Sequence, residues 1–381
     1  MWKFPHYEVG QPIPWDKLEK EFSWFRDMKG VEQDAVWHAE GDVFVHTKMV
    51  AEALVSHPDF QVLSKQDKHI LFAVAMLHDV EKRSTTEEEE IVENGVKRMA
   101  TTSRNHAKKG EKTARAILYK DISTPFGIRE EICKLVRHHG SPIWAMDREE
   151  SDKYAIEISL RCNTKHLALF AKADILGRIA KDSEDMMARV ELFEMICDTN
   201  DCFGKPKEFK SKLGKRHYFT HEEAWPDYEP YDEKNFIAYV MSALPGSGKD
   251  TYIKNNLSNL PMVSIDEVRR ERKVRRGDKK AEGQAYQAVK EMCKVHMRER
   301  KDFVFNATNI TKDMRGKVIK EFEEYGAKVT VIYIEVPYKK LISQNHNREH
   351  KVPEDAVNDM LFALDVPDAT ECYDVIYQVE K

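Results

Sequence analysis

Residues 243–251, with the sequence Ala-Leu-Pro-Gly-Ser-Gly-Lys-Asp-Thr, constrain the fold more than any other stretch of the chain. They lie between an apolar run at 236–242, expected to form a strand, and a segment at 249–257, expected to form a helix. Two glycines let the backbone turn tightly so that its N–H groups converge on a phosphate, and the helix N-terminus adds positive potential. The residues expected to bind a nucleotide are Gly246, Ser247, Gly248, Lys249, Asp250 and Thr251.

The region from residue 235 onward alternates between strand-like and helix-like runs. The strand-like runs occupy 236–242, 262–265, 303–306, 329–335 and 374–379. The helix-like runs between them occupy 249–257, 283–299, 312–325, 339–346 and 354–364. This alternation predicts an α/β domain at 235–381, built on a doubly wound parallel sheet.

The first 203 residues have the pattern of an all-α domain. Residues 67–78 are apolar on most sides, which predicts a buried helix, and strand-like runs are scarce. The acidic run at 87–90 is typical of the solvated start of a helix. Residues 204–234 contain three prolines and change from basic to acidic and aromatic, so we interpret them as a linker. Its basic half is either a contact for a nucleic-acid backbone or a solvated connector.

Composition narrows the class of protein. The chain has 381 residues, enough for two domains with separate cores. Its net charge of −5 means that nucleic acid could be bound only through local basic patches. The six cysteines include no C-x-x-C pair, which favours reduced thiols in a cytoplasmic protein. No run of 18 apolar residues is present, so we expect no membrane span.

The first domain contains a series of potential metal ligands. They are His46, His78, Asp79, His106, His138, His139 and Asp174. The buried helix at 67–78 ends in His-Asp, which puts an imidazole and a carboxylate at the edge of the core. Such a carboxylate can bridge two cations, and two cations can activate a water and stabilise the charge on a phosphoryl group. Imidazoles suit Mn, Fe, Co, Ni or Zn better than Mg²⁺. Any single histidine of the series would more often be structural.

The series resembles the signature of the HD phosphohydrolase superfamily. The stretch 38–47 is similar to the HD domains of bacterial tRNA nucleotidyltransferases, which act on 2′,3′-cyclic phosphates and 2′-phosphates. The resemblance implies one metal on His46, His78, Asp79 and Asp174. It implies a second metal on His106, His138 and His139, with Asp79 as the bridge. Residues 78–82 resemble the H-D-x-G-K motif with Glu81 in place of Gly, so Lys82 is either a phosphate contact or a surface lysine.

Polar residues also follow the predicted strands of the second domain. Asp266 comes at the end of one strand, where it can accept a proton from an attacking hydroxyl, and Arg269 can clamp an acceptor phosphate. The alternative is an N-cap Asp with a surface Arg. Asn309 follows the next strand at the expected ligand-binding edge of the sheet. Arg348 can close over the nucleotide as a lid.

These residues resemble the 5′-hydroxyl polynucleotide kinase domains of phage and bacterial end-healing enzymes. The resemblance makes Lys249 the phosphate-binding lysine, Asp266 the general base, Arg269 the acceptor-phosphate clamp and Arg348 the lid arginine. The chain departs from that pattern where Asp250 replaces the usual metal-binding Ser and where Gln344 replaces a first lid arginine. Either Asp250 or Thr251 is then left to hold the Mg²⁺ ion.

Taken together, the two halves resemble the bifunctional bacterial HD-Pnk end-healing family. The resemblance implies removal of a 2′,3′-cyclic phosphate or 2′-phosphate at one RNA or DNA end and ATP-dependent phosphorylation of the 5′-OH at the other. It implies ATP with Mg²⁺ in the kinase, one or two transition metals in the HD site, and a ligase as a partner in the pathway. The main alternative is an HD nucleotidase fused to a small-molecule kinase. A further alternative is a non-catalytic, ATP-gated regulator.

Overall fold

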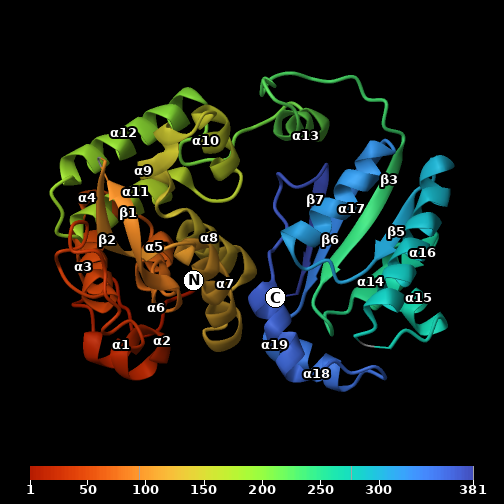
Figure 1. Cartoon of the computed structure of the whole chain (residues 1–381), viewed down its shortest axis with the longest axis horizontal. Helices are drawn as coiled ribbons and strands as arrows, with labels where there is room; N and C mark the ends of the chain where they lie inside the picture. The colour runs from red at the N-terminus through yellow and green to blue at the C-terminus, as the bar shows by residue number, and fades with distance from the viewer. Residues whose placement is uncertain (94, 276, 381) are drawn as a thin grey trace. The chain divides into compact units, whose positions relative to one another are not determined.

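The computed structural model describes residues 1–93, 95–275 and 277–380. The chain divides into two compact units, Met1–Glu208 and Phe209–Lys381. Within the described residues, no helix is both long enough and apolar enough to cross a membrane. The two units are shown in Figure 1 and are described separately.

The first unit is helical, as predicted. Several of its helices pack against α5, whose residues from Lys68 to Leu77 are all buried. The α-helices are α1 (Trp15–Glu21), α2 (Ser23–Arg26), α3 (Val43–Ser56), α4 (Pro58–Gln61), α5 (Lys65–Leu77), α6 (Lys82–Thr85), α7 (His106–Ala116), α8 (Phe126–His138), α9 (Ser141–Trp144), α10 (Ser151–Ser159), α11 (Thr164–Leu176) and α12 (Ser183–Thr199). A π-helical turn (Ile117–Asp121) and a 3₁₀ turn (Ala145–Asp147) complete the unit.

The acidic run at 87–90 is not the start of a helix, so that prediction is wrong. It lies in β1 (Thr86–Glu93), which pairs antiparallel with β2 (Val96–Ser103). The partner strand supplies opposite charges and hydroxyls: Glu90 pairs with Lys97 at 2.7 Å, and Glu89 accepts hydrogen bonds from Thr102 and Arg104. Cross-strand pairs of this kind stabilise a hairpin, and they depend on residues seven to fifteen positions away.

The second unit contains the predicted doubly wound parallel sheet. Its strands are β3 (Phe236–Ala243), β4 (Met262–Ser264), β5 (Phe303–Asn306), β6 (Ala327–Glu335) and β7 (Asp374–Val379), in the order β4-β5-β3-β6-β7. Its helices are α13 (Lys212–Thr220), α14 (Lys249–Asn256), α15 (Ile265–Glu271), α16 (Lys279–Arg298), α17 (Lys312–Glu324), α18 (Tyr338–His346) and α19 (Glu354–Ala363). All strand pairs are parallel.

Alternate residues of the central strand β3 pack into two separate cores. Ala238 and Val240 lie in the core formed with α16 and α17, whereas Met241 and Ala243 lie in the core that includes Ile253 of α14. This alternation follows from the period of two in a strand, and it buries both faces of the sheet. Because β4, β5 and β3 are parallel neighbours, their carboxyl ends lie at the same edge of the sheet.

The segment predicted as a linker, 204–234, contains a helix. Helix α13 belongs to the second unit, where Arg216 forms a two-armed ion pair with Glu323 of α17 at 2.7 and 2.8 Å. The aromatic residues that follow α13 stay largely in solvent, since Trp225 is 78% and Tyr231 86% exposed. The boundary between the compact units falls at Glu208–Phe209, near the start of the predicted linker.

Candidate functional site

The first unit gathers six of the seven predicted metal ligands at one buried point. His46 comes from α3, and His78 and Asp79 follow α5. The remaining ligands are His106 at the start of α7, His139 directly after α8 and Asp174 on α11. Five helices thus bring together residues that are up to 128 positions apart in the sequence.

The imidazoles are oriented by contacts behind the site. The Nδ1 atoms of His78, His106 and His139 lie 2.9, 2.7 and 2.8 Å from the backbone carbonyl oxygens of Ala75, Ser103 and Val136. A carbonyl oxygen only accepts, so each Nδ1 carries the proton and each Nε2 presents a lone pair to the cluster. Metal-ligating histidines are held in this way.

Asp79 lies between two groups of imidazoles. Its Oδ2 atom is 3.2 Å from His78 Nε2 and 3.6 Å from His46 Nε2, whereas its Oδ1 atom is 3.3 Å from His106 Nε2 and 4.0 Å from His139 Nε2. Asp174 Oδ1 lies on the first side, 3.2 Å from His46 Nε2. The Oδ1 atoms of both aspartates are buried without a hydrogen-bond partner in the described part of the chain. The donor set is therefore compatible with divalent cations.

The charge states of Asp79, Asp174 and His139 suit metal binding. Burial alone would raise the pKa of Asp79, but its interactions with His78 and Lys82 lower it well below its ordinary value. Burial likewise opposes ionisation of Asp174, and the Arg178 guanidinium outweighs it and lowers the pKa. Burial, followed by the charges of His106 and His78, lowers the pKa of His139 to about 3. Carboxylates are thus ionised and His139 is neutral, as ligands must be.

His138 is not part of this cluster, although the sequence placed it there. Its Nδ1 atom lies 3.3 Å from the Ser141 hydroxyl, and burial, together with the charge of Arg161, lowers its pKa. Successive residues of a helix point about 100° apart, so His138 and His139 at the end of α8 cannot share a target. Among the described residues, the group around Asp79 that could hold a metal consists of His46, His78, His106 and His139.

Lys82 and Glu40 lie beside the cluster and contact its members. Lys82 is a buried residue, not a surface lysine, and its Nζ atom lies 2.8 Å from Asp79 Oδ2 and 2.7 Å from Gln33 Oε1. Glu40 was missed as a functional residue from the sequence. Its Oε1 atom lies 2.9 Å from His46 Nδ1 and 2.8 Å from His38 Nδ1, so a carboxylate stands behind the His46 imidazole. Its position within the 38–47 motif was the available signal.

In the second unit, the loop at 243–251 folds as a phosphate cradle between β3 and α14. Gly246 and Gly248 have φ angles of +89° and +90°, which favour glycine. A Cβ atom on Gly246 would lie 2.6 Å from the Leu341 carbonyl oxygen, so a side chain there would displace α18. The Ser247 hydroxyl is buried and has no hydrogen-bond partner among the described residues, and a phosphate oxygen would satisfy it.

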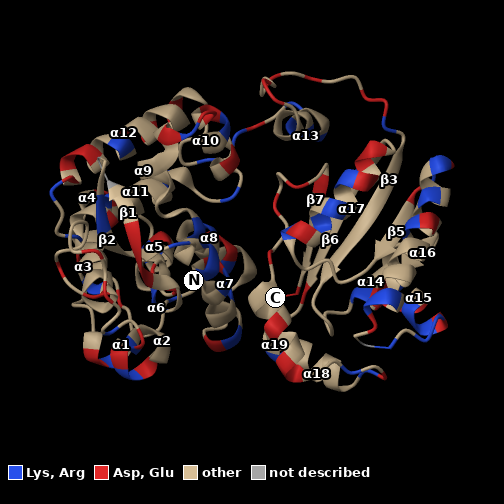
Figure 2. Cartoon of the chain, in the orientation of Figure 1, with Lys and Arg blue, Asp and Glu red and all other residues tan. Residues whose placement is uncertain are grey.

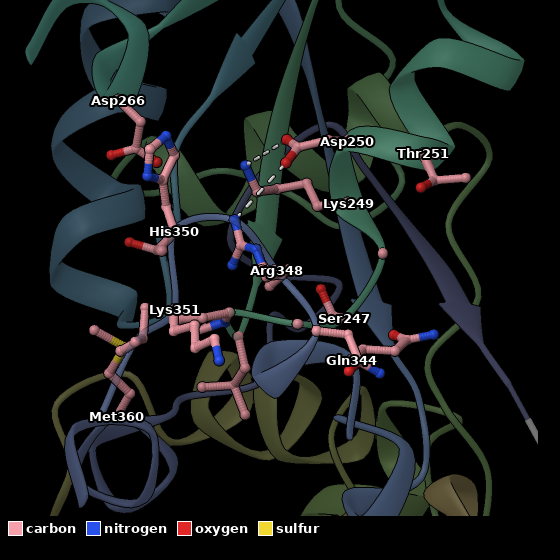
Figure 3. Close-up of a pocket in the computed structure, with 18 of the residues that line it drawn as sticks. Ser247, Lys249, Asp250, Thr251, Asp266, Gln344, Arg348, His350, Lys351 and Met360 are labelled. Atoms are coloured by element: carbon pink, nitrogen blue, oxygen red, sulfur yellow. Dashed lines mark hydrogen bonds and ion pairs between the residues drawn. The ribbon is translucent and has the colours of Figure 1, made fainter. Parts of the chain in front are cut away.

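This loop opens into a cavity of about 860 Å³. Figure 3 shows Lys249 directed toward Asp250, and Asp266 on the far wall. The Arg348 guanidinium lies 4.0 Å from the Asp250 carboxylate, and the Lys249 amine is 3.4 Å from it. Asn306, at the end of β5, contacts both Lys249 and Asp250, so the loop and the neighbouring strand are joined by side chains. The predicted nucleotide residues thus share one cavity with the predicted base and lid arginine.

Asp266 is not the N-cap of α15, which was the alternative interpretation. The N-cap is Ser264, whose hydroxyl accepts from the Glu267 N–H at 3.4 Å. Asp266 is exposed in the first turn of α15 and lines the cavity. Arg269 NH1 lies 3.2 Å from Asp266 Oδ1, and its Nε lies 2.8 Å from Glu282 Oε2.

Asn309 does not face the cavity, contrary to its predicted role in binding substrate. Its side-chain amide is buried and donates to the Met241 carbonyl at 2.9 Å. Its own carbonyl accepts from Ser242 Oγ and from Arg315. Asn309 therefore braces the end of β3 from behind, and its φ of +43° suits an Asn in this tight connection. Thr308, its neighbour, lines the cavity instead.

Two family models match the chain at these sites. Residues 43–178 match the family described as HD domain, and residues 239–367 match the family described as AAA domain. The chain joins an HD domain to a P-loop kinase-like domain. The metal cluster falls within the HD match, and the phosphate loop, Asp266 and Arg348 fall within the kinase-like match. The kinase-like domain implies a nucleotide with Mg²⁺, and the HD cluster is compatible with divalent cations.

Solved structures add only distant likenesses. A putative kinase from Chloroflexus aurantiacus J-10-fl is 12% identical over 38% of this chain and 89% of that chain, with a TM-score of 0.31. An unliganded sugar kinase from Janibacter sp. HTCC2649 is 14% identical over 38% of this chain and 85% of that chain, with a TM-score of 0.29. Scores this low support no conclusion about substrate. No curated protein matches the chain.

Proposed function

We propose that the chain heals broken nucleic-acid ends. The HD domain removes a 2′,3′-cyclic phosphate or a 2′-phosphate from one end, and the kinase-like domain phosphorylates the 5′-OH of the other with ATP. A ligase can then seal the ends. The observation that carries the proposal is that Asp266 and three arginines line the same cavity as the phosphate loop, so a proton acceptor and phosphate-binding cations surround the place where a γ-phosphate would lie.

In the kinase-like domain, the loop residues and Lys249 hold the β- and γ-phosphates. Asp266 accepts the proton of the 5′-hydroxyl, whose oxygen forms a bond to the γ-phosphorus as the bond to the ADP oxygen breaks. Arg348 lies close enough to the phosphate loop to balance charge on the transferring group.

In the HD domain, divalent cations would supply Lewis acidity and an activated water. The chain's own contribution is to hold the imidazoles with their Nε2 atoms inward and to keep Asp79 ionised. The Lys82 amine lies beside the Asp79 carboxylate and is suited to contact a phosphate oxygen of the substrate. Four imidazoles in the cluster favour a transition metal over Mg²⁺.

The test uses end-labelled oligonucleotides that carry 5′-OH, 2′-phosphate, 3′-phosphate or 2′,3′-cyclic ends, incubated with ATP and a panel of metals. We expect 5′-phosphorylation with Mg²⁺, and phosphate release from 2′-phosphate and cyclic ends with Mn²⁺, Ni²⁺ or Co²⁺. A chain that phosphorylates free nucleosides or sugars but no oligonucleotide would instead be a small-molecule kinase fused to an HD nucleotidase.

A further inference from the structure

We propose that an open groove between α16 and α17 binds the single-stranded body of the nucleic acid whose 5′-OH end is phosphorylated. The inference rests on the proposed kinase function and names the surface that holds the substrate outside the reaction cavity. The groove lies on the outer side of the two helices that cover one face of the sheet.

The groove has a volume of about 590 Å³ and is lined by lysines, tyrosines and two glutamates. Its lining residues are Tyr286, Lys290, Lys294, Lys317, Lys320, Glu321, Glu324 and Tyr325. The Lys290 amine of α16 lies 2.8 Å from the Glu321 carboxylate of α17, so the two helices form its opposite walls.

Aromatic rings and cations alternate along these walls. Tyr286 is 38% and Tyr325 37% exposed, which leaves part of each ring available to a ligand. The Lys290 amine lies 5.6 Å from the centre of the Tyr286 ring. A ring beside an amine suits a nucleotide unit, because the base stacks on the ring while the adjacent phosphate meets the charge.

The groove begins beside the reaction cavity. Arg269 lines that cavity, and its Nε atom lies 2.8 Å from the Glu282 carboxylate of α16. Tyr286, Lys290 and Lys294 follow Glu282 at intervals of four residues, so they lie along one face of α16. The helix rises about 18 Å between Glu282 and Lys294. This length corresponds to roughly five stacked nucleotides at about 3.4 Å each.

A second cavity continues the groove at its far end. It has a volume of about 740 Å³, lies among α13, residues 230–234 and the end of α17, and shares Lys320 and Glu324 with the groove. Arg300 and Tyr231 also line it, and Tyr231 is 86% exposed. The side chains of Lys320 and Arg300 have no hydrogen-bond or ion-pair partner among the described residues. A strand that leaves the groove would therefore pass further cations and a further ring.

The charge of this surface favours a polyanion. Seven Lys or Arg residues and four Glu residues line the two cavities, in a chain whose net charge is −5. Figure 2 shows Lys and Arg on α13, α16 and α17. Lys294 and Lys317 each pair with a carboxylate of their own helix, but surface pairs of this kind contribute little energy and a phosphate can replace them. The tyrosines favour a nucleic acid over an acidic peptide, because bases stack on them.

The first experiment measures the kinase KM for a 5′-OH dinucleotide and for a 5′-OH dodecanucleotide. We expect the KM of the dodecanucleotide to be at least about tenfold lower, because only the longer strand reaches the groove. The double variant Lys294→Ala/Lys317→Ala should remove most of this difference and leave the KM values for the dinucleotide and for ATP unchanged. The matched control is Lys339→Ala/Lys340→Ala, which removes the same charge from exposed positions on α18 and should behave as the wild type.

The second experiment tests whether the groove recognises bases as well as charge. Tyr286→Ala should raise the KM of the dodecanucleotide about fivefold, whereas Tyr286→Phe keeps the ring and should behave as the wild type. Poly-L-glutamate, a polyanion without bases, should compete poorly with the dodecanucleotide.

Three results would overturn the inference. They are equal KM values for the two lengths, a Lys294→Ala/Lys317→Ala variant that keeps the wild-type difference, and competition by poly-L-glutamate as strong as that by an unlabelled oligonucleotide, which would make the groove a site for an acidic protein. A wild-type enzyme that phosphorylates neither the dinucleotide nor the dodecanucleotide would instead overturn the proposed function.

Discussion

In the HD domain, Oε1 of Glu40 lies 2.9 Å from Nδ1 of His46, behind the ring whose Nε2 atom faces Asp79 and Asp174. A carboxylate in this place fixes the tautomer and raises the basicity of a ligating imidazole. We therefore expect Glu40→Gln to lower the affinity for Mn²⁺ or Ni²⁺ about 10- to 100-fold. Metal titration of the purified protein measures this, with the exposed Glu88→Gln as control. Equal affinities in both variants would contradict the role of Glu40.

The two active sites should respond separately to substitution. Asp79→Ala removes the carboxylate shared by both groups of imidazoles and should abolish phosphate release from a 2′-phosphate end while 5′-phosphorylation continues. Lys249→Ala should have the reverse effect, because the phosphate loop loses its cation. Each variant is assayed for both activities, and each serves as the control of the other. Loss of both activities in either variant would argue against independent sites.

Asp250 should determine the Mg²⁺ requirement of the kinase-like domain. Figure 3 shows its carboxylate among Lys249 and Arg348, whereas Thr251 lies apart from them. We expect Asp250→Ala to raise the Mg²⁺ concentration for half-maximal kinase activity several-fold, and Thr251→Ala to leave it unchanged. Asp250→Ser restores the more usual residue and should retain activity. A Thr251→Ala variant with the larger shift would make Thr251 the metal ligand instead.

The buried ion pair of Arg315 and Glu371 should be essential to the stability of the second unit. Arg315 is fully buried, and its Nε and NH2 atoms each lie 2.8 Å from a Glu371 oxygen. Removing one partner leaves an unpaired buried charge, so Glu371→Ala should lower the free energy of unfolding by about 3 kcal/mol. Urea denaturation followed by fluorescence measures this. Asp313→Ala, which breaks the exposed pair with Lys317, is the matched control and should change stability little.

Glu111 should make the first unit sensitive to acid. Burial opposes its ionisation, but the Lys134 and Arg115 cations, each 2.8 Å away, hold the pKa of this carboxyl below its ordinary value. Because the folded-state pKa is depressed, the stabilisation is fully present above the unfolded pKa of about 4.3 and is lost progressively as pH falls from there through the folded-state pKa. Glu111→Gln should therefore lose less stability than the wild type between pH 7 and pH 4.

Urea unfolding at both pH values, with a chelator present so that metal release does not contribute, measures the Glu111 effect. The exposed Glu149→Gln provides the control and should follow the wild type. A Glu111→Gln variant with the full acid sensitivity of the wild type would show that other carboxylates cause it.

Local sequence patterns were sufficient for the fold class and for most of the site. The strand–glycine loop–helix order around Lys249 predicts the phosphate cradle because its geometry depends on residues that are adjacent in the chain. Spaced His and Asp residues likewise predicted a metal cluster. The hairpin at Thr86–Ser103 was missed because its stability comes from partners on the opposite strand.

The assignment of individual site residues depended on the direction in which each side chain points in the folded chain. The sequence by itself determined which residue types were available, such as His138 beside His139 and Asn309 beside Thr308. For His138 and His139, and for Asn309 and Thr308, only the tertiary structure decided which member of the pair faces a site. Adjacent residues on a helix or in a turn point in different directions, and the packing of distant elements selects the one that is used.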